Sequence, residues 1–338
     1  MKVKIPELIS AGLILSYRCT AECRHCMYAC TPKWEDRWIS QKDLEEILSR
    51  LAGKIKPSPW GKDAVSLNYG LHFTGGEPFL NFELLVKAQE IAEELGIPST
   101  FVETNCYWCR DDNVTREKLK LLKNKGLKGI LISVNPFYTE YIPFERTERC
   151  IRISKEIFGE NVMVYQVEYY HQFKKLRIKG RISLKDYIKI VGKRGLTEKV
   201  ELFLMGRAAY RLKELYPLWP AENFFEEPCI PSFLRSWHNH FDNYGNFVPG
   251  YCGGISLGNW HKLDSLIEEG IDVGRHPVLK FLIKEDMKGL FQFAKEKGYR
   301  KKEEGYLSKC HLCLDIRKYL VSKENLEELA PSEFYEYL

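Results

Sequence analysis

The sequence contains no long hydrophobic run. No apolar stretch reaches the roughly 18 residues that a membrane-spanning helix needs. Residues 1–12 lack the apolar core and cleavage site of a secretory signal peptide. Basic residues are not in large excess either, because 51 Lys and Arg nearly balance 46 Asp and Glu, and no basic tract dominates. These absences predict a cytoplasmic protein that binds neither membrane nor nucleic acid.

The cysteine count is odd, with eleven cysteines in 338 residues. A disulfide framework uses cysteines in pairs and is typical of secreted proteins, so it is not expected in a cytoplasmic chain with an odd number. We therefore interpret the cysteines as metal ligands or redox groups. Since 44% of the residues are hydrophobic, the chain can bury a large core. Its length predicts two domains, or one barrel with an appendage.

Short apolar segments alternate with helical patterns between residue 11 and about residue 215. Residues 82–95 are the clearest helix, with one apolar face, Asn81 as N-cap and Gly96 after the last turn. Six βα units in series predict an α/β fold with a parallel sheet, a partial (βα)6 TIM-like barrel. The predicted strands are 12–16, 70–74, 100–104, 129–134, 162–168 and 200–205, and the other predicted helices are 114–124, 145–158, 184–193 and 207–215.

The pattern changes after about residue 216, where Pro, Gly, Asn and aromatic residues become frequent. Residues 238–248 are predicted to form a hairpin with its turn at 243–245. Helical patterns follow at 260–270 and 277–297, and a last short helix is expected after Cys313. The chain is therefore predicted to consist of a barrel domain, residues 1–215, and a small α+β domain, residues 216–338.

Three cysteines directly after the first predicted strand carry the strongest chemical signal. Cys19, Cys23 and Cys26 have the spacing C-x3-C-x2-C. Thiolates are soft ligands that suit iron–sulfur clusters or zinc. Because a closed structural site has four protein ligands, three cysteines in eight residues indicate a site with one open position. On a cubane cluster, one iron would then be available to a small molecule.

Polar residues follow the next predicted strands. The run 75–78, Gly-Gly-Glu-Pro, comes after the second strand, and its glycines let the backbone approach a ligand closely. The runs 103–105 and 133–135 end the third and fourth strands. Each run alone also fits an ordinary strand end or turn. Because the carboxyl ends of parallel strands meet at one edge, together they indicate one binding site.

The cysteine motif followed by this glycine run resembles the radical S-adenosylmethionine (SAM) superfamily, over residues 11–215. The resemblance implies that Cys19, Cys23 and Cys26 hold a 4Fe–4S cluster whose unique iron chelates the methionine part of SAM. In many members, Gly follows the Asn of the third strand, where this chain has Cys106. The residues that the resemblance places around SAM are Gly75, Gly76 and Glu77, which would receive its amino group, and Glu103, Asn105, Ser133, Asn135, Gly206 and Arg207.

The resemblance also implies a reaction. A reductant such as flavodoxin or ferredoxin delivers an electron to the cluster, and the electron passes to the sulfonium of SAM. One C–S bond breaks, which gives methionine and a 5′-deoxyadenosyl radical. The radical then takes a hydrogen from an unactivated C–H bond of the substrate. The cofactor supplies the difficult chemistry, and the protein orients the substrate and excludes water.

Four further cysteines, Cys229, Cys252, Cys310 and Cys313, lie in the C-terminal region. Four thiolates complete a closed site, and the residues alone leave zinc and a 4Fe–4S cluster equally open. Behind a radical SAM barrel, the pattern resembles the twitch domain, the shortened form of the SPASM domain. That resemblance implies one auxiliary 4Fe–4S cluster, which would serve in electron transfer.

Cys106 and Cys109 form another C-x2-C pair just after the third strand. The pair is a candidate for a catalytic hydrogen donor, a redox pair or a third metal site, and it also fits a local feature without function. Cys150 falls in a predicted helix and is expected to be buried as a small apolar residue.

Glu168 and Gln166 alternate along the predicted fifth strand. They are expected to face the barrel interior as substrate contacts, with Glu168 the catalytic candidate. The alternative is a solvated strand end. Arg207 is predicted either to bind a carboxylate through two hydrogen bonds or to form an ion pair at the surface.

The resemblance leaves the substrate class open. Modification of a peptide or protein, by oxidation, crosslinking or epimerisation, is favoured because it is the commoner role in this group. The alternative is dehydrogenation of a small molecule such as a sugar or aminocyclitol, to which the C-terminal cysteine arrangement is similar. No separate peptide-recognition domain precedes Cys19, although some peptide-modifying relatives lack one. A non-catalytic zinc-binding protein is a third hypothesis, disfavoured by the open three-cysteine site and the glycine run.

Overall fold

The computed structural model describes all residues except 1, 199, 201 and 230–232. The chain divides into two compact units. The first, called here the sheet unit, contains residues 9–23 and 30–202. The second, the C-terminal unit, contains residues 1–8, 24–29 and 203–338. The second unit thus takes up two short N-terminal segments, so each unit is discontinuous in sequence.

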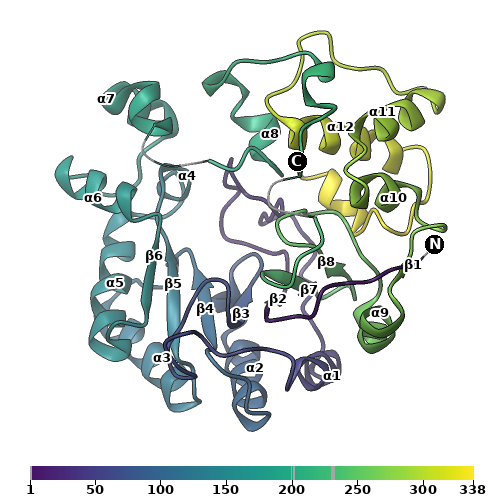
Figure 1. Cartoon of the computed structure of the whole chain (residues 1–338). Helices are drawn as coiled ribbons and strands as arrows, with labels where there is room; N and C mark the ends of the chain where they lie inside the picture. Colours follow the sequence, from purple (N-terminus) through teal and green to yellow (C-terminus); the bar gives the residue numbers. More distant parts are fainter. Residues whose placement is uncertain (1, 199, 201, 230–232) are drawn as a thin grey trace. The chain divides into compact units, whose positions relative to one another are not determined.

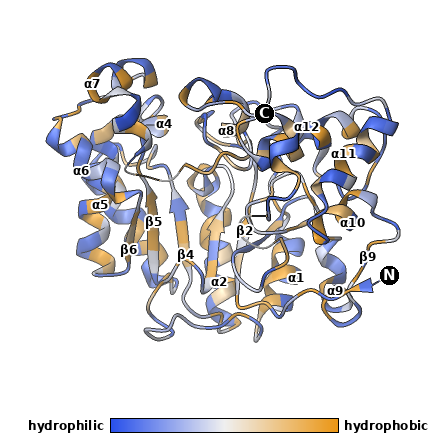
Figure 2. Cartoon of the chain, turned by 45° about the horizontal axis from the view of Figure 1, so that its top comes forward, coloured by the Kyte–Doolittle hydropathy of each residue, from blue (hydrophilic) through white to orange (hydrophobic). Residues whose placement is uncertain are grey.

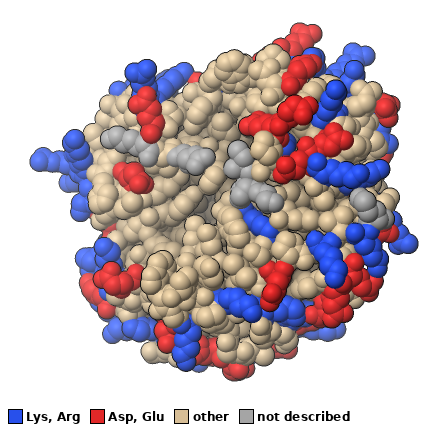
Figure 3. All heavy atoms as spheres, viewed as in Figure 1, with Lys and Arg blue, Asp and Glu red and all other residues tan. Residues whose placement is uncertain are grey.

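The surface carries mixed charge. On the face shown in Figure 3, Lys and Arg side chains are interspersed with Asp and Glu side chains, as the near balance of basic and acidic residues predicts. Within the part of the chain that the structure describes, no helix has both the length and the apolar character needed to cross a bilayer.

A parallel β-sheet organises the sheet unit. Its strands lie in the order β6-β5-β4-β3-β2, and every neighbouring pair is parallel (Figure 1). This arrangement confirms the α/β class with a parallel sheet. The strands are β2 (Ser10–Ile14), β3 (Gly70–Thr74), β4 (Phe101–Thr104), β5 (Gly129–Ser133) and β6 (Val162–Tyr165).

Helices connect these strands. The predicted helix at 82–95 is confirmed as α2, and Asn81 caps it by accepting a hydrogen bond from the Leu84 amide. The predicted helices at 114–124 and 145–158 are confirmed as α3 and α5, which pack against each other. The helices of this unit are α1 (Gln41–Leu51), η1 (Pro78–Asn81), α2 (Phe82–Glu94), α3 (Asp112–Asn124), α4 (Pro136–Thr139), α5 (Phe144–Phe158), α6 (Val167–Lys175) and α7 (Leu184–Thr197).

One face of the sheet passes from apolar to polar along the strands. Phe101 and Leu131 are buried in a cluster with Val65, and most of β5 is hydrophobic in Figure 2. Side chains two residues apart on a strand share a face. In the register that pairs Glu103 with Leu131, Glu103 and Ser133 therefore continue this face toward the carboxyl ends of β4 and β5.

Two of the predicted strands need correction. The strand expected at 162–168 ends at Tyr165, and α6 begins at Val167. Glu168 therefore lies in the first turn of a helix and is exposed, so the argument that placed it inside the barrel was wrong. At 200–205, residue 200 and residues 202–205 are not in a strand, and residue 201 lies outside the described residues.

The C-terminal unit contains the predicted hairpin, formed by the antiparallel strands β7 (Asn239–Asp242) and β8 (Phe247–Val248). Gly245 in its turn has a φ of +94°, which favours glycine. The predicted helix at 277–297 is two helices, because Glu285 interrupts it with a φ of +56°. The remaining elements are β1 (Lys2–Val3) paired antiparallel with β9 (Ile271–Asp272), α8 (Ala208–Arg211), η2 (Lys213–Leu215), η3 (Ala221–Phe224), η4 (Trp260–Lys262), α9 (Leu263–Glu269), α10 (Pro277–Ile283), α11 (Met287–Glu296), α12 (Lys309–Val321) and η5 (Ser332–Tyr335).

The N-cap of α2 gives a direct test of this local structure. Replacing Asn81 with Ala removes the oxygen that accepts from the Leu84 amide, 3.2 Å away. We expect the free energy of unfolding to fall by about 1 kcal/mol, with a lower midpoint in thermal denaturation. Glu94→Ala, at the exposed end of the same helix, is the control and should leave the midpoint nearly unchanged. Equal effects of the two substitutions would contradict the capping role.

Candidate functional site

The loop after β2 carries the first two cysteines of the N-terminal motif. Cys19 and Cys23 are buried, with 7% and 4% of their surfaces exposed. The amide of Cys19 donates to the carbonyl of Thr31, 3.3 Å away, and Thr31 Oγ1 donates to Glu22. These bonds fold the loop back on itself within the sheet unit, so the backbone at Cys19 is held in place before any ligand is considered.

The glycine turn after β3 packs directly on the backbone just before Cys19. The Gly76 amide donates to Ser16 O at 2.8 Å, and the Glu77 amide donates to Arg18 O at 3.1 Å. A Cβ on Gly76 would lie 1.9 Å from Arg18 O, and one on Gly75 would lie 2.4 Å from Ser16 O. Glycine is therefore required here for close backbone approach. The turn fixes the start of the cysteine loop.

Glu77 is buried and extensively hydrogen bonded. Its carboxylate accepts from Thr104 Oγ1 at 3.0 Å, from the Asn105 amide at 2.8 Å and from the Phe79 amide at 3.2 Å. Burial raises the pKa of Glu77 to about 8, although these hydrogen bonds oppose the shift. The side chain thus ties the end of β4 to the glycine turn, which is a structural use of the residue expected beside the amino group of SAM.

Asn105 lies beside the first cysteine. Its Nδ2 is 3.6 Å from Cys19 Sγ and 3.1 Å from Thr20 Oγ1, while its Oδ1 accepts from the Tyr107 amide. An amide N–H directed at a thiolate stabilises the charged form. The structure therefore brings this residue to Cys19, from a strand end that is far from it in the sequence.

Glu103 and Ser133 lie at the ends of β4 and β5 on the same sheet face. Glu103 accepts a 2.6 Å hydrogen bond from Thr74 Oγ1, and its carboxylate is 3.7 Å from His72 Nε2. Burial raises the pKa of Glu103 to about 7. Asn135 is different, because its Oδ1 caps α4 by accepting from the amides of residues 137 and 138.

The third cysteine, Cys26, belongs to the short segment 24–29 of the C-terminal unit. Its carbonyl accepts from the Arg207 amide at 3.0 Å, and the Arg207 guanidinium donates to Ala29 O and Tyr337 O. Arg207 is only 1% exposed, so the alternative of a surface ion pair was wrong. A Cβ on Gly206 would lie 2.6 Å from Cys26 O. Gly206 and Arg207 thus support the backbone around Cys26.

The four C-terminal cysteines line one pocket, with a volume of about 90 Å³. Cys229 and Cys252 come from loops, while Cys310 and Cys313 lie in the first turns of α12. Partial positive charge at a helix N-terminus favours thiolates. Arg317, one helical turn further on, also lines the pocket. The structure therefore brings together the four thiols that the sequence grouped only by spacing.

Burial opposes the ionisation of two thiols in this pocket. Burial raises the pKa of Cys252 to about 12, and burial together with the neighbouring thiols raises that of Cys310 above its usual range. Arg317 is buried, but Tyr335 and the thiols of Cys313 and Cys252 hold its pKa above the usual range. Four thiolates could be held together here only if a metal or cluster offset their charge.

His311 lies between the two helical cysteines but is used in another way. Its Nδ1 accepts from the Leu307 amide at 3.1 Å, and Nε2 is 3.3 Å from Lys302 Nζ. Burial lowers the pKa of His311 to about 4. The ring therefore stabilises the turn that precedes α12.

The second C-x2-C pair has a partner that sequence reasoning missed. Cys106 and Cys109 lie with Cys150 of α5, with their sulfur atoms all within 4.8 Å of one another. All three are 0% exposed. Only the spacing of Cys106 and Cys109 signalled this group, because Cys150 lies in a separate helix. Thr104, which links Glu77 to this loop, and Arg317 were also missed, since neither belongs to a motif.

Comparison with known proteins finds a family model that matches the N-terminal part of the chain. Residues 13–167 match the family model described as "Radical SAM superfamily". No curated protein matches the chain. The matched segment includes Cys19, Cys23, Cys26 and the glycine turn.

Solved structures give weaker matches. "Native anSMEcpe with bound AdoMet" is 13% identical, with a TM-score of 0.46, and the match covers 93% of this chain and 97% of that one. "Crystal structure of BtrN in complex with AdoMet and 2-DOIA" is 12% identical, with a TM-score of 0.42 and coverage of 84% and 90%. Both likenesses are weak.

The buried Glu77 predicts a dependence of stability on pH. Its pKa is near 8 in the folded protein and 4.5 without the fold, so folding favours the protonated acid. Its contribution to stability is complete below pH 4.5 and is lost as the pH rises toward 8. We expect Glu77→Gln, which has no charge to bury, to lose less stability than the wild type between pH 5 and pH 8 in thermal denaturation.

An exposed acid provides the control for this comparison. Glu94→Gln changes the same functional group at the end of α2 and should follow the wild-type pH profile. If the profiles of Glu77→Gln and the wild type were parallel, Glu77 would not be the neutral buried acid described here.

Proposed function

The chain carries a radical SAM domain at residues 13–167, and we propose that it is an enzyme that cleaves SAM reductively and removes a hydrogen atom from a peptide or protein. The observation that carries the proposal is the packing around Cys19. The glycine turn holds the backbone at Ser16 and Arg18, and the Asn105 amide reaches the Cys19 sulfur from β4. The family motif and its supporting contacts thus coincide at the same thiol.

The residues present fit a 4Fe–4S cluster and SAM. Cys19, Cys23 and Cys26 offer three soft ligands in one short loop, which leaves one iron of a cubane without a protein ligand. When bound, the cluster and SAM supply one electron and a 5′-deoxyadenosyl radical. The chain's own contribution is to orient: Asn105 donates toward the Cys19 thiolate, and buried Glu77 holds the Asn105 backbone in place.

SAM would meet the polar end of the sheet. Glu103 and Ser133 lie on one face at the carboxyl ends of β4 and β5, where hydroxyl groups of a ribose can be bound. Thr74 directs its hydroxyl at Glu103 and so fixes that carboxylate. Because parallel strands place their ligands at this edge, the arrangement supports the nucleoside contacts that the family resemblance implies.

We further propose that Cys229, Cys252, Cys310 and Cys313 hold an auxiliary 4Fe–4S cluster, as in twitch domains. All four thiols line one pocket, and the N-terminus of α12 and Arg317 offset negative charge there. Complete ligation by cysteine leaves no iron for a substrate, which suits electron transfer. A zinc ion is the alternative occupant, because the same donor set is found in structural zinc sites.

Metal content and SAM cleavage test the two cysteine sets. Anaerobically reconstituted protein should contain about eight irons per chain, as two cubanes require, and should form 5′-deoxyadenosine from SAM and a reductant such as flavodoxin. Cys23→Ser should abolish this product. Cys310→Ser should lose about half of the iron but keep SAM cleavage, since the first cluster is intact, while turnover of substrate stops.

Iron analysis and chromatography of 5′-deoxyadenosine test these outcomes together. Cys30→Ser, a buried cysteine outside both sets, is the control and should retain iron and activity. Zinc in place of iron, with no SAM cleavage, would support the non-catalytic alternative. Normal turnover by Cys310→Ser would contradict the electron-transfer role of the auxiliary site.

Peptide or protein modification is the proposed reaction class because it is the commoner role among relatives with such a C-terminal cysteine set. The spacing of that set, two separated cysteines followed by C-x2-C, supports the alternative of a small-molecule dehydrogenase. The two differ in which molecule loses its hydrogen atom.

Hydrogen transfer itself can identify the substrate class. Cells that naturally make this protein would be grown in D2O, and their extract would be separated into a peptide fraction and a small-molecule fraction. Each fraction would then be supplied to the reconstituted enzyme. We expect deuterium in 5′-deoxyadenosine only with the peptide fraction, and protease treatment should remove it. Mass spectrometry of 5′-deoxyadenosine is the measurement. Transfer from the small-molecule fraction alone would favour the dehydrogenase.

A further inference from the structure

A third group of thiols lies in the sheet unit, apart from both cysteine sets used above. Cys106 and Cys109 follow β4, and Cys150 lies in the middle of α5. Their sulfur atoms are all within 4.8 Å of one another, and none of the three cysteines forms a disulfide. All three side chains are 0% exposed. A loop and a distant helix thus converge on one closed set of soft donors.

We propose that Cys106, Cys109 and Cys150 bind a single thiophilic metal ion, Zn²⁺ being the probe of choice. A Zn–S bond of about 2.3 Å separates the sulfurs of a three-thiolate site by about 4 Å, which agrees with the observed grouping. A cubane needs its thiolates farther apart, because they surround four irons rather than one ion. The size of the group therefore favours a mononuclear site.

The backbone around Cys106 and Cys109 is already ordered for such a site. The Cys106 amide donates to Thr104 Oγ1 at 3.0 Å, and the Cys109 amide donates to Cys106 O at 3.1 Å. Cys106 adopts a φ of +67°, an uncommon conformation for a residue other than glycine. Trp108 Nε1 also donates to Thr104 Oγ1. Both sulfurs of the pair are thus turned toward α5 by contacts that need no metal.

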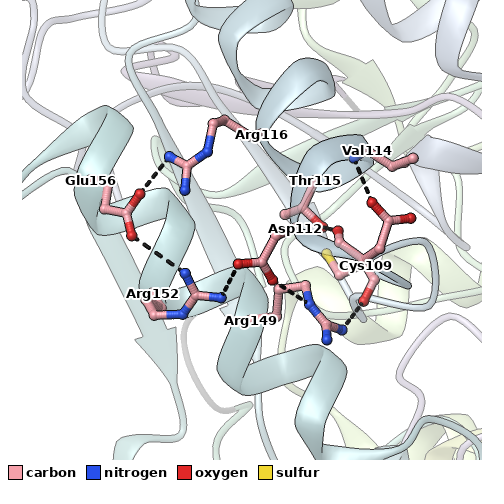
Figure 4. Close-up of polar contacts among 9 residues, drawn as sticks. Cys109, Asp112, Val114, Thr115, Arg116, Arg149, Arg152 and Glu156 are labelled. Carbon is pink, nitrogen blue, oxygen red and sulfur yellow. Dashed lines mark hydrogen bonds and ion pairs between the residues drawn. The ribbon is translucent and has the colours of Figure 1, made fainter.

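The surrounding charges suit an anionic centre. Three thiolates and one Zn²⁺ leave a net charge of −1. Two arginines of α5 meet the same loop, because Arg146 donates to Tyr107 O and Arg149 donates to Cys109 O at 2.8 Å. Figure 4 shows how Asp112 holds Arg149 against Cys109, through a 2.8 Å ion pair. The two guanidinium groups are therefore fixed next to the loop that carries the charge.

Cys150 also lies near a hydroxyl group of its own helix. Ser154 Oγ is 3.9 Å from Cys150 Sγ, one turn along α5. A polar group is therefore available beside the three sulfurs within the described residues.

The ion would join the loop after β4 to α5. That loop begins at Asn105, the residue whose amide reaches Cys19. A structural ion suits the complete burial of the three thiols better than hydrogen donation does, since a donor must touch its substrate. The inference does not depend on the proposed function, because none of the three residues belongs to either cluster motif.

The test is a zinc and iron analysis of full-length protein made in zinc-supplemented medium and purified anaerobically. We expect about one zinc per chain in addition to iron, and zinc-edge X-ray absorption with three sulfurs at about 2.3 Å. Cys150→Ser and Cys109→Ser should each lose the zinc and keep their iron. Cys30→Ser, which alters another buried cysteine, should keep both metals.

The opposite results overturn the proposal. Wild-type protein without zinc, or with a disulfide among the three cysteines, would show that they do not form a metal site. Loss of zinc in Cys310→Ser but not in Cys150→Ser would place the ion in the four-cysteine pocket, and would also contradict the auxiliary cluster. The absorption spectrum of the wild type tests the site even if the variants fold poorly. SAM cleavage, followed separately, reports on the proposed function.

Discussion

The sheet unit depends on one steric constraint, the absence of a side chain at Gly76. Only without a Cβ can the turn after β3 lie against Arg18 O, where an added carbon would be 1.9 Å away. From this contact a closed ring of interactions follows. The turn positions Glu77, Glu77 binds the Asn105 amide, and Asn105 returns to the Cys19 sulfur. The backbone just before Cys19 and the Cys19 sulfur itself are thus both held by this ring.

Glu77 shows how the ring combines structure with electrostatics. The family resemblance places this residue near the amino group of SAM, yet its oxygens already accept from Thr104, Asn105 and Phe79. With a pKa near 8, the acid is mostly protonated at neutral pH. A cation brought beside it would favour the carboxylate. A cation bound beside Glu77 would therefore release a proton from this acid.

The sequence predicted those parts of the structure that depend on local pattern. Apolar periodicity located α2, α3 and α5, because each helix buries one face, and Asn81 also marked the start of α2. The strand at 162–168 was extended too far, since the residues that begin α6 also alternate like a strand. The split at Glu285 depends on one backbone angle that no residue pattern reports.

The candidate site was likewise predicted only in part from the sequence. The sequence was sufficient to group Cys229, Cys252, Cys310 and Cys313 as one set of four thiols, and these line the same pocket. It could not attach Cys150 to the pair at 106 and 109, because that contact depends on the packing of α5 against the loop after β4. Nor could it show that Arg207 is buried against main-chain carbonyls, since burial of an arginine arises only from tertiary structure.

The discontinuous makeup of the C-terminal unit has a consequence for the order of events during synthesis. Residues 24–29 emerge early, but most of the unit to which they belong lies beyond residue 202. The Cys26 carbonyl, for instance, can accept its hydrogen bond from the Arg207 amide only after residue 207 has been synthesised. Contacts of such long sequence separation form slowly. The sheet unit can assemble first, with Cys19 and Cys23 in place, while the surroundings of Cys26 remain unfinished. A cluster that used Cys26 as a ligand would therefore be completed only after translation of most of the chain.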